Sequence, residues 1–599
     1  MTIASLRRCV LSLLLTGLLA LPLPAQTPLP DYSKGNSHIP NLMAPYAPKR
    51  VAPPNLANSP RVDDLIQGGK LYLSLQDAIY LAIENNLDIA TARYDPATTA
   101  TTLLSAKGGS VIGPVRVSGA SLDPRIGSTL SIQRSYLPLN NPFLAGTGTT
   151  VTQAKFNQDI GVGAFQYVQG FDTGTAFSVG WDSRRTYNNP TGSFFNHNIQ
   201  TRLYLTLSQP LLNGFGRTQN ARAIRVAKNN MLISDQTFLQ AVMDIVSNVK
   251  RSYWELVFAI EDVKVKEQSV GLAEKLYEDN KRQVEIGTLA PIEVVRAESE
   301  VARTRQDLII SQTNLRQQQT LLKDQITKNP IDPLVALVEI VPTDHPDVPL
   351  TPEVLPIQDA IQVAMEKRPE VISAQLDIKN RNLDSKAAKQ ALLPGLEVFG
   401  FYGGVGLSGL GQTCLPGDVC PPDPVTVVES SGLARSITRA WQGDFPDYGF
   451  GLNISLPIKN RVAQAESARA QIAQRQSETR YQRTINTVVV EVRNAQIAME
   501  QNLARVDAAQ KNTRLAQETY DAEQKKFQLG ASTIFLVIQA QRDLAQARSG
   551  EVRAMADFER ARVDFDRALG RTMERNQITI DDAKAGMVSA ASTPPPPQP

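Results

Sequence analysis

Residues that carry specialised chemistry are scarce in this chain of 599 residues, which holds three cysteines and three histidines. An excess of one charge is also lacking, because 62 basic residues nearly balance 59 acidic ones and leave a formal net charge of +3. Such a chain has no basic stripe for nucleic acid, so no nucleic-acid partner is expected. Beyond the amino terminus there is no apolar run of about 18 residues, so no transmembrane helix is predicted.

The histidines give no sign of a metal centre. His38, His197 and His345 lie far apart in predicted loops and lack the spacing of zinc ligands. The sequence contains no P-loop and no nucleophile elbow. The stretch GGVGLSGLG from Gly403 lacks the strand-to-helix setting of a dinucleotide site, and we expect an exposed loop there. The chain is therefore predicted not to be an enzyme and to use no cofactor or metal.

The amino terminus has the features of a secretory signal peptide over residues 1–25. Arg7 and Arg8 form a charged region, an apolar region follows, and PLPA supplies small residues for cleavage before Gln26. A buried amino-terminal helix is the alternative. The exported chain keeps Cys414 and Cys420 in CLPGDVC, which favours a disulfide that closes a small loop. Two free, exposed thiols are the alternative.

Two long segments of the chain repeat each other. QDAIYLAIENN from Gln76 returns as QDAIQVAMEKR from Gln358, and EIGTLAPIEVVRAE around Gly287 corresponds to QLGASTIFLVIQAQ around Gly530. These units are much longer than a solenoid repeat, so they indicate one protomer with two similar halves. We expect a first repeat over residues 71–340 and a second over 341–572. A disordered Pro-rich lead-in (26–70) and a disordered Pro-rich tail (573–599) would flank them.

Very long helices are predicted in both halves. Ile458 to Leu529 contains no glycine and no proline, and as one helix it would be roughly 110 Å long. Arg217 to Ile286 is similar, with Gly271 as its one interruption. Apolar residues at three-four spacing form a seam in each helix: Val242, Ile245, Val249, Tyr253, Leu256, Ile260 and Val263, then Val488, Val492, Ala495, Met499, Leu503 and Val506. The spacing indicates coiled-coil-like packing, with an ordinary helical bundle core as the alternative.

Before each long helix the apolar period changes to 2. Two runs alternate with polar or small residues: Ile199, Thr201, Leu203, Leu205 and Leu207, then Tyr448, Phe450, Leu452, Ile454 and Leu456. Strands near ten residues with one apolar face are typical of transmembrane β-barrels, although a half-buried soluble strand gives the same pattern. Export, duplication and the long helices favour the membrane.

Partner strands are expected ahead of these runs. LEVFGFY from Leu396 is one, STLSIQRSY from Ser128 is its first-half equivalent, and TAFSVGWDSRRTY from Thr175 is an extra hairpin strand. About four membrane strands cannot close a barrel, and an open edge in lipid leaves backbone groups unsatisfied. The expected fold is therefore mixed α and β and internally duplicated, with a long α-helical, coiled-coil-like barrel and a transmembrane β-barrel shared between chains.

Matched turns end the long helices. Gly287 and Gly530 supply the permissive backbone that ends a helix, and Pro291 suits the start of the next one. A plain αα-hairpin is the alternative. The duplicated turn is more specific than that, because alanines follow it at matched positions: Ala297 and Ala540, then Ala302 and Ala545.

With these turns the chain resembles the TolC family of outer-membrane efflux proteins. The resemblance extends to LSLQDAIYLAIENNLDI at Leu73, LTLSQPLLNGFG at Leu205 and KAAKQALLPGLEVFG at Lys386, and it covers roughly residues 70 to 572. It implies a homotrimer in the outer membrane, in contact with outer-membrane lipid and extending into the periplasm. Each protomer would give four strands to a barrel of about 12 strands and four helical strands to a periplasmic tunnel. The implied partners are a periplasmic adaptor (membrane fusion) protein and an inner-membrane pump or ABC exporter.

The function that this resemblance implies is a passive exit duct, which would serve a tripartite efflux pump or a type I secretion system. The alternative is a non-conducting coiled-coil tether that spans the periplasm. Relatives dock their adaptor on the equivalent turns. The resemblance therefore assigns docking to Gly287, Thr288, Leu289 and Ala290 and to Gly530, Ala531, Ser532 and Thr533.

The tunnel entrance would follow at Glu293, Phe535, Leu536 and Gln539. Some relatives carry an acidic ring here, which Leu536 and Gln539 do not reproduce. Phe527 and Ser532 stand where relatives have the aromatic and basic partners that close the mouth. A cation-binding ring and a salt-bridge lock are therefore not expected. Phe535 or Leu536 would form an apolar constriction, and the alternative is that these side chains only pack between helices.

Overall fold

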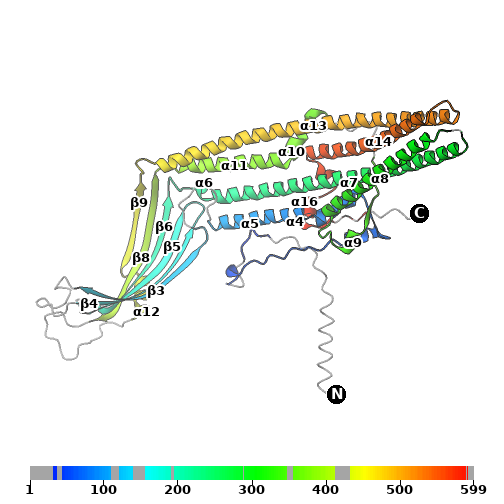
Figure 1. Ribbon diagram of the computed structural model, residues 1–599. Coiled ribbons are helices and arrows are strands. Elements are labelled where there is room, and N and C mark those ends of the chain that lie inside the picture. The colour runs from blue at the N-terminus through cyan, green and yellow to red at the C-terminus, as the bar shows by residue number, and fades with distance from the viewer. Residues whose placement is uncertain are drawn as a thin grey trace, which may run out of the picture. The chain divides into compact units, whose positions relative to one another are not determined.

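The structure is a computed structural model that describes residues 31–36, 43–109, 121–138, 155–189, 195–287, 289–346, 355–411, 432–588, 590 and 592. The predicted signal peptide, His38, Thr288, Cys414 and Cys420 lie outside these ranges. Helices and β-strands are both present, as the sequence predicts, and Figure 1 shows their order along the chain. The chain forms two compact units, one from residues 1–98, 232–375 and 480–599, the other from 99–231 and 376–479. Each unit thus combines segments of both predicted repeats.

The predicted long helices are present in both repeats. The first is α7 (Arg222–Glu285), preceded by the short α6 (Arg217–Asn220), and it is followed by α8 (Ile292–Ile326). The second is α13 (Arg461–Gln528), followed by α14 (Ile534–Ala568). Most residues of the two apolar seams are buried, and Val249 and Val492 are fully inaccessible to solvent, while Ile245, Ile260, Ala495 and Leu503 are half-buried. The three-four spacing therefore predicted both the helices and the side that packs.

The first unit contains a small sheet that the sequence did not predict. It joins β1 (Ile66–Gln67), β2 (Lys70–Leu73) and β7 (Glu339–Pro342), with β2 and β7 parallel. The duplicated QDAI segments form matching helices, α3 (Leu75–Asn85) and α10 (Ile357–Lys367). The Oγ atom of Ser74 accepts a hydrogen bond from the backbone N–H of Asp77 and so caps α3.

Short helices complete the two units. Before α3 in the chain come the 3₁₀ helix η1 (Ala44–Tyr46) and α2 (Arg61–Asp64), and after it come α4 (Leu87–Ala92) and α5 (Tyr94–Lys107). The others are α9 (Pro333–Ala336), α11 (Pro369–Gln390), α12 (Leu433–Gln442), α15 (Thr572–Arg575) and α16 (Ile580–Ala585).

The expected disorder of both flanking segments is wrong for the parts nearest the repeats. Residues 573–588 pack onto the first unit, because Met573, Ile578, Ala583 and Val588 are buried in one cluster with Phe238 of α7. In the lead-in, Val62 and Leu65 belong to another buried cluster. Composition suggested disorder, but a few apolar side chains suffice to hold each segment.

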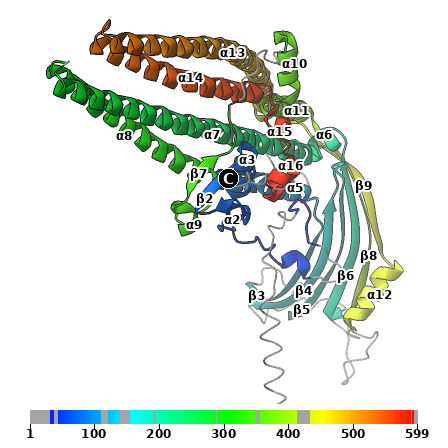
Figure 2. The same ribbon diagram turned by 90° about the vertical axis from the view of Figure 1, so that its right-hand side faces the viewer.

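The second unit is built on a six-stranded antiparallel sheet in the order β3–β4–β5–β6–β8–β9 (Figure 2). The strands are β3 (Arg125–Pro138), β4 (Lys155–Gly170), β5 (Ala176–Asn189), β6 (Phe195–Pro210), β8 (Gly395–Gly411) and β9 (Pro446–Ser455). The predicted strands are all present, but three expectations about them are wrong.

The first error concerns pairing. β3 was expected to be the partner of β6, but it pairs with β4. Within the first repeat, β6 pairs instead with β5, which was predicted to be the extra hairpin strand. The second is the number of strands in the sheet, which has six because β4 was not predicted, where about four membrane strands and one extra hairpin strand were expected. The third is GGVGLSGLG, which lies in β8 rather than in a loop. His197 likewise lies in β6, not in a loop.

One face of the sheet is apolar and exposed. Residues that pair across strands point to the same side, so the pairing of Leu205 with Val179 and with Tyr402 places all three on one face. Leu130 of β3 and Phe450 of β9 belong to the same face. All five side chains are exposed to solvent in the single chain. The opposite face carries mainly polar or small residues from β5 and β6, such as Asp182 and Arg202.

Helix α12 lies against the apolar face, over glycines of β8. A Cβ atom built on Gly406 would lie only 1.9 Å from the carbonyl oxygen of Ser436, and one on Gly404 only 2.0 Å from that of Ala440. Because Gly404 and Gly406 have no side chains, the backbone of α12 can lie directly against β8. Beneath it, the buried hydroxyl of Thr201 is hydrogen-bonded both to Ser183 and to Ser436.

Candidate functional site

The turn between α7 and α8 is the first of the two predicted docking turns. Gly287 ends α7 with a φ of +83°, which lies in the left-handed region that favours glycine. Its backbone N–H donates to the carbonyl oxygen of Val284 at 3.0 Å, which satisfies one of the last carbonyls of the helix. Pro291 then occupies the position before α8, with a helical backbone. Both glycine and proline act here as the sequence predicts.

The turn between α13 and α14 has the same design. Gly530 has a φ of +74° and donates to the carbonyl oxygen of Phe527 at 3.0 Å, while Ala531 donates to that of Lys526 at 2.9 Å. These two bonds form the Schellman motif that ends many helices at a glycine. The Oγ of Ser532 donates to Glu523 at 2.7 Å, so this turn is also tied by a side chain. Hydrogen bonds from Lys526 and Ser532 hold the pKa of Glu523 below its usual range.

Both turns present exposed residues. Ile286 and Leu529, the residues just before the two glycines, are 76% and 84% exposed. No atom lies within 4 Å of the point where a Cβ would stand on Gly287 or Gly530. Among the other predicted docking residues, Ala290, Ala531 and Thr533 are exposed, while Leu289 and Ser532 are half-buried. The two tips therefore resemble each other in backbone conformation and in the apolar residue that they expose.

The predicted entrance residues lie on the first turn of α8 and the first two turns of α14. Glu293 accepts a hydrogen bond from Arg296 at 3.0 Å, so its charge is already paired. Gln539 donates to Asp543 of the same helix at 2.9 Å. Phe535 and Leu536 are exposed, whereas Ile534 and Val537 beside them are buried. Phe535 and Leu536 therefore do not pack between helices within the single chain.

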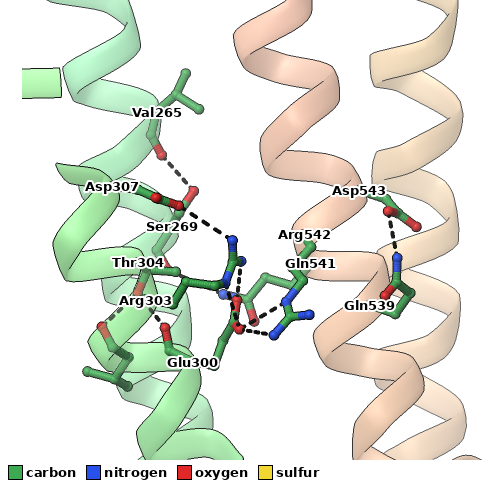
Figure 3. A network of polar contacts seen from close by, with 11 residues as sticks. Val265, Ser269, Glu300, Arg303, Thr304, Asp307, Gln539, Gln541, Arg542 and Asp543 are labelled. Carbon is green, nitrogen blue, oxygen red and sulfur yellow. Dashed lines mark hydrogen bonds and ion pairs between the residues drawn. The ribbon is translucent and has the colours of Figure 1, made fainter. Parts of the chain in front are cut away.

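A buried carboxylate that the sequence did not single out lies further along the same helices (Figure 3). Glu300 of α8 is only 2% exposed and is held between Arg303 of its own helix and Arg542 of α14. The Nε atoms of the two arginines lie 3.1 Å and 2.9 Å from its Oε2. Burial raises the pKa of Glu300, but these hydrogen bonds outweigh burial and hold the pKa below its usual value.

Other polar contacts join α7 to the second hairpin. Asp262 of α7 accepts hydrogen bonds from Ser311 of α8 and Ser549 of α14, each at 2.7 Å. The side chain of Gln541 donates to the backbone carbonyl of Ser269 at 3.2 Å. None of these contacts links matched positions of the two repeats, so the duplication gave no signal for them. The two hairpins of one chain are thus joined by a series of polar contacts behind their tips.

The family follows from a comparison of the sequence with known families. The profile described as "Outer membrane efflux protein" matches residues 173–325 and 360–571, more than half of the chain. The chain is a member of the outer membrane efflux protein family. This family is one of outer-membrane efflux proteins rather than of enzymes, as the sequence predicts. A curated relative is Nodulation protein T of Rhizobium leguminosarum bv. trifolii, 22% identical over 342 residues, or 56% of this chain. The match spans 64% of the length of that relative.

Solved structures of channels share the fold of this outer membrane efflux protein. The Campylobacter jejuni CmeC outer membrane channel has a TM-score of 0.56 at 15% identity, over 91% of this chain and 98% of its own. The outer membrane protein VceC of Vibrio cholerae has 0.56 at 13%, over 83% and 96%. The open state of the Neisseria gonorrhoeae MtrE outer membrane channel has 0.52 at 16%, over 84% and 91%.

Two further observations complete the description of this outer membrane efflux protein. In the part of the chain that the structure describes, no helix combines the length and the apolarity needed to cross a membrane. Within the same ranges, no group of three or more His, Cys, Asp or Glu side chains is arranged to hold a metal ion.

Proposed function

We propose that this channel is the passive outer-membrane exit duct of an export assembly that spans the cell envelope. The inner-membrane pump of a tripartite efflux system, or the ABC exporter of a type I secretion system, would supply the energy. The six-stranded sheet would lie in the outer membrane, with its apolar face against lipid and its polar face toward the transported solute. The helical hairpins would extend this duct into the periplasm.

The sheet supports assembly from several copies. Its first and last strands, β3 and β9, each have one neighbour in the described sheet. Their outer edges would leave backbone N–H and C=O groups unpaired in lipid, where no water can satisfy them. Closure with further copies of the chain removes these edges. A homotrimer is the assembly that the resemblance to TolC-like proteins implies.

The observation that carries the proposed docking function is the pair of matched tips. Ile286 and Leu529 are both highly exposed, and each is followed by a glycine with a left-handed backbone that ends the helix. An exposed apolar residue on a rigid turn is suited to enter a groove of a partner protein, because its burial needs little reordering of the backbone. Three copies would present six such tips to the hairpins of a periplasmic adaptor.

The entrance of the duct would be apolar. Phe535 and Leu536 are exposed in one chain, and three copies would bring three of each together around the opening. The only acid among the predicted entrance residues, Glu293, is paired with Arg296, so it adds little free negative charge. We therefore expect weak selectivity for cations at this end, in contrast to an acidic ring.

Conductance separates this proposal from a non-conducting tether. The full chain, purified and inserted into planar lipid bilayers, should give discrete current steps, and Phe535→Ala with Leu536→Ala should widen the entrance and raise the current. The matched control is Ile292→Ala, which alters an exposed apolar residue at the first position of α8. Insertion without any current, in a protein with normal β-sheet content, would support the tether instead.

A further inference from the structure

The β3–β4 hairpin continues the sheet beyond β5 without a break. Every residue of β4 from Asn157 to Gly170 has a partner on β5, and every residue of β3 from Arg125 to Pro138 has one on β4. The outer edge of β5 is therefore fully occupied by the chain's own hairpin. A neighbouring copy has access to β3 and not to β5.

The side chains of β3 also fit a wall strand. Leu130 and Ile132 are 85% and 93% exposed and lie on the apolar face that also carries Phe450 of β9. The residues between them, such as Thr129 and Ser131, are polar and face the other side. A hairpin outside the membrane would expose this apolar row to water, which is unfavourable. In the wall, the same row would face lipid.

Strand directions permit closure through β3. All neighbours in the sheet are antiparallel, so β9, the sixth strand, runs opposite to β3, the first. When β9 of one copy lies beside β3 of the next, the pair is antiparallel as well. An even number of antiparallel strands per copy is the arrangement that closed outer-membrane barrels use.

From this register we infer that all six strands form the wall, and that β3 of one copy pairs with β9 of the next. This inference rests on the trimer of the proposed function. Three copies then give a barrel of about 18 strands instead of about 12. Barrel diameter grows roughly in proportion to strand number, so this duct would be about one and a half times as wide in the membrane. Solutes too bulky for a barrel of about 12 strands could then pass.

Cysteine crosslinking tests which strand meets β9. In a background with Cys414→Ser and Cys420→Ser, Asn453→Cys on β9 is combined with Thr129→Cys, Ser131→Cys or Gln133→Cys on β3. The matched set places cysteine on the same face of β5, at Ser178, Asp182 or Thr186. A short bismaleimide is added to the outer membrane, and crosslinked species are separated by size. We expect dimer and trimer bands from at least one β3 pair and none from the β5 pairs.

The other outcomes are distinguishable. Bands from β5 pairs alone would overturn the inference, because β5 would then be the edge and the hairpin would lie outside the wall. Bands from neither set, with all proteins present in the membrane, would contradict the trimer of the proposed function.

Pore width gives a second measurement that does not depend on the choice of crosslinking positions. Neutral polyethylene glycols of graded size reduce the conductance of a pore only when they enter it. The polymer size at which the current is no longer lowered is the cutoff. We expect this cutoff to be larger than the cutoff of a channel of about 12 strands measured in parallel. The same measurement is made on the variant with Phe535→Ala and Leu536→Ala, whose entrance is wider. If this variant has the same polymer cutoff, the entrance is not the narrowest point, and a cutoff equal to that of the channel of about 12 strands would then contradict the wider barrel.

Discussion

Arg542 of α14 reaches Glu300 of α8, with its Nε 2.9 Å from the carboxylate, and this ion pair is one of several that join the two helical hairpins of a chain. The carboxylate is buried and Arg303 contacts it from its own helix. At the predicted entrance, Glu293 pairs with Arg296 of its own helix. The pair of Glu300 with Arg542 lies about two helical turns further along α8.

Replacing Arg542 should loosen this link without unfolding the chain. We expect Arg542→Gln to weaken the interaction between the two hairpins by about 1 kcal/mol. The loss is small because the Arg542 side chain is half-exposed and because Arg303 still pairs with Glu300 in the variant. Backbone amides of α8 and α14 near Glu300 should then exchange hydrogen faster. The matched control is Arg305→Gln, which removes a pair with Glu274 inside one hairpin. Equal exchange in Arg542→Gln and the unaltered protein would show that the pair does not hold the hairpins together.

The same carboxylate predicts a dependence on pH. The folded pKa of Glu300 lies below its ordinary value of 4.5, so folding favours the charged form. The stability that it contributes is complete above about pH 4.5 and is lost as the pH falls through the lowered pKa. Hydrogen exchange in α8 and α14 should therefore rise below that pH. In Glu300→Gln this rise should be weaker, and an identical pH profile in both proteins would assign the effect to other carboxylates.

The tip glycines should serve docking more than folding. Valine at Gly287 and Gly530 would force a β-branched residue into a left-handed backbone, at a cost of roughly 1–2 kcal/mol each. We expect normal amounts of assembled protein in the outer membrane with loss of export. The matched control is Gly271→Val, because Gly271 lies in α7 with ordinary helical backbone and open space around it. Normal export by the double variant would exclude these turns from docking, whereas loss of the assembly would assign the glycines to folding.

The cysteine loop remains a prediction from the sequence. Cys414 and Cys420 should form a disulfide, and mass spectrometry without reduction should find the loop two hydrogens lighter than the reduced form. A bridge that closes so short a loop contributes about 2 kcal/mol or less. Replacing both with Ser should leave assembly intact. A variant that no longer assembles would show that the loop has a structural role larger than its length suggests.

The docked carboxyl-terminal segment should contribute to stability. Ile578 is buried beside Phe238, so Ile578→Ala should lower the free energy of unfolding by about 2–4 kcal/mol. Ile580→Ala changes an exposed residue two positions later and should cost no more than about 0.5 kcal/mol. Thermal unfolding of both variants would measure the difference. Equal midpoints would mean that residues 573–588 unfold independently of the helices.

The sequence predicted those elements that have one clear period. The long helices followed from seams such as Val249 and Val492, and β6 and β9 followed from strict alternation. β4 was missed because both of its faces carry apolar residues, for example Val162 on one and Phe165 on the other, so it has no alternation. The pairing of β5 with β6 was also out of reach, because register is set by contacts between strands and not within them.

The candidate site divides in the same way. Gly287 and Gly530 could be found because a left-handed turn requires glycine and the turn occurs twice. The pair of Glu300 with Arg542 could not be predicted, because it depends on how α8 and α14 are aligned along their axes. The glycine-rich stretch of β8 could not be predicted as a strand, since such a stretch is far more common in a loop than in a strand that lies under a helix.

The hydroxyl cluster under α12 makes the two repeats depend on each other. Ser183 and Thr201 belong to the first repeat and Ser436 to the second, and both bonds exist only when β5, β6 and α12 are together. The close contact of α12 with the sheet also needs Gly404 and Gly406 of β8, which belong to the second repeat. Without α12, Thr201 would keep its bond to Ser183 and lose the one to Ser436. The place of α12 is therefore made by both repeats together, so neither half of the duplicated chain could hold this helix alone.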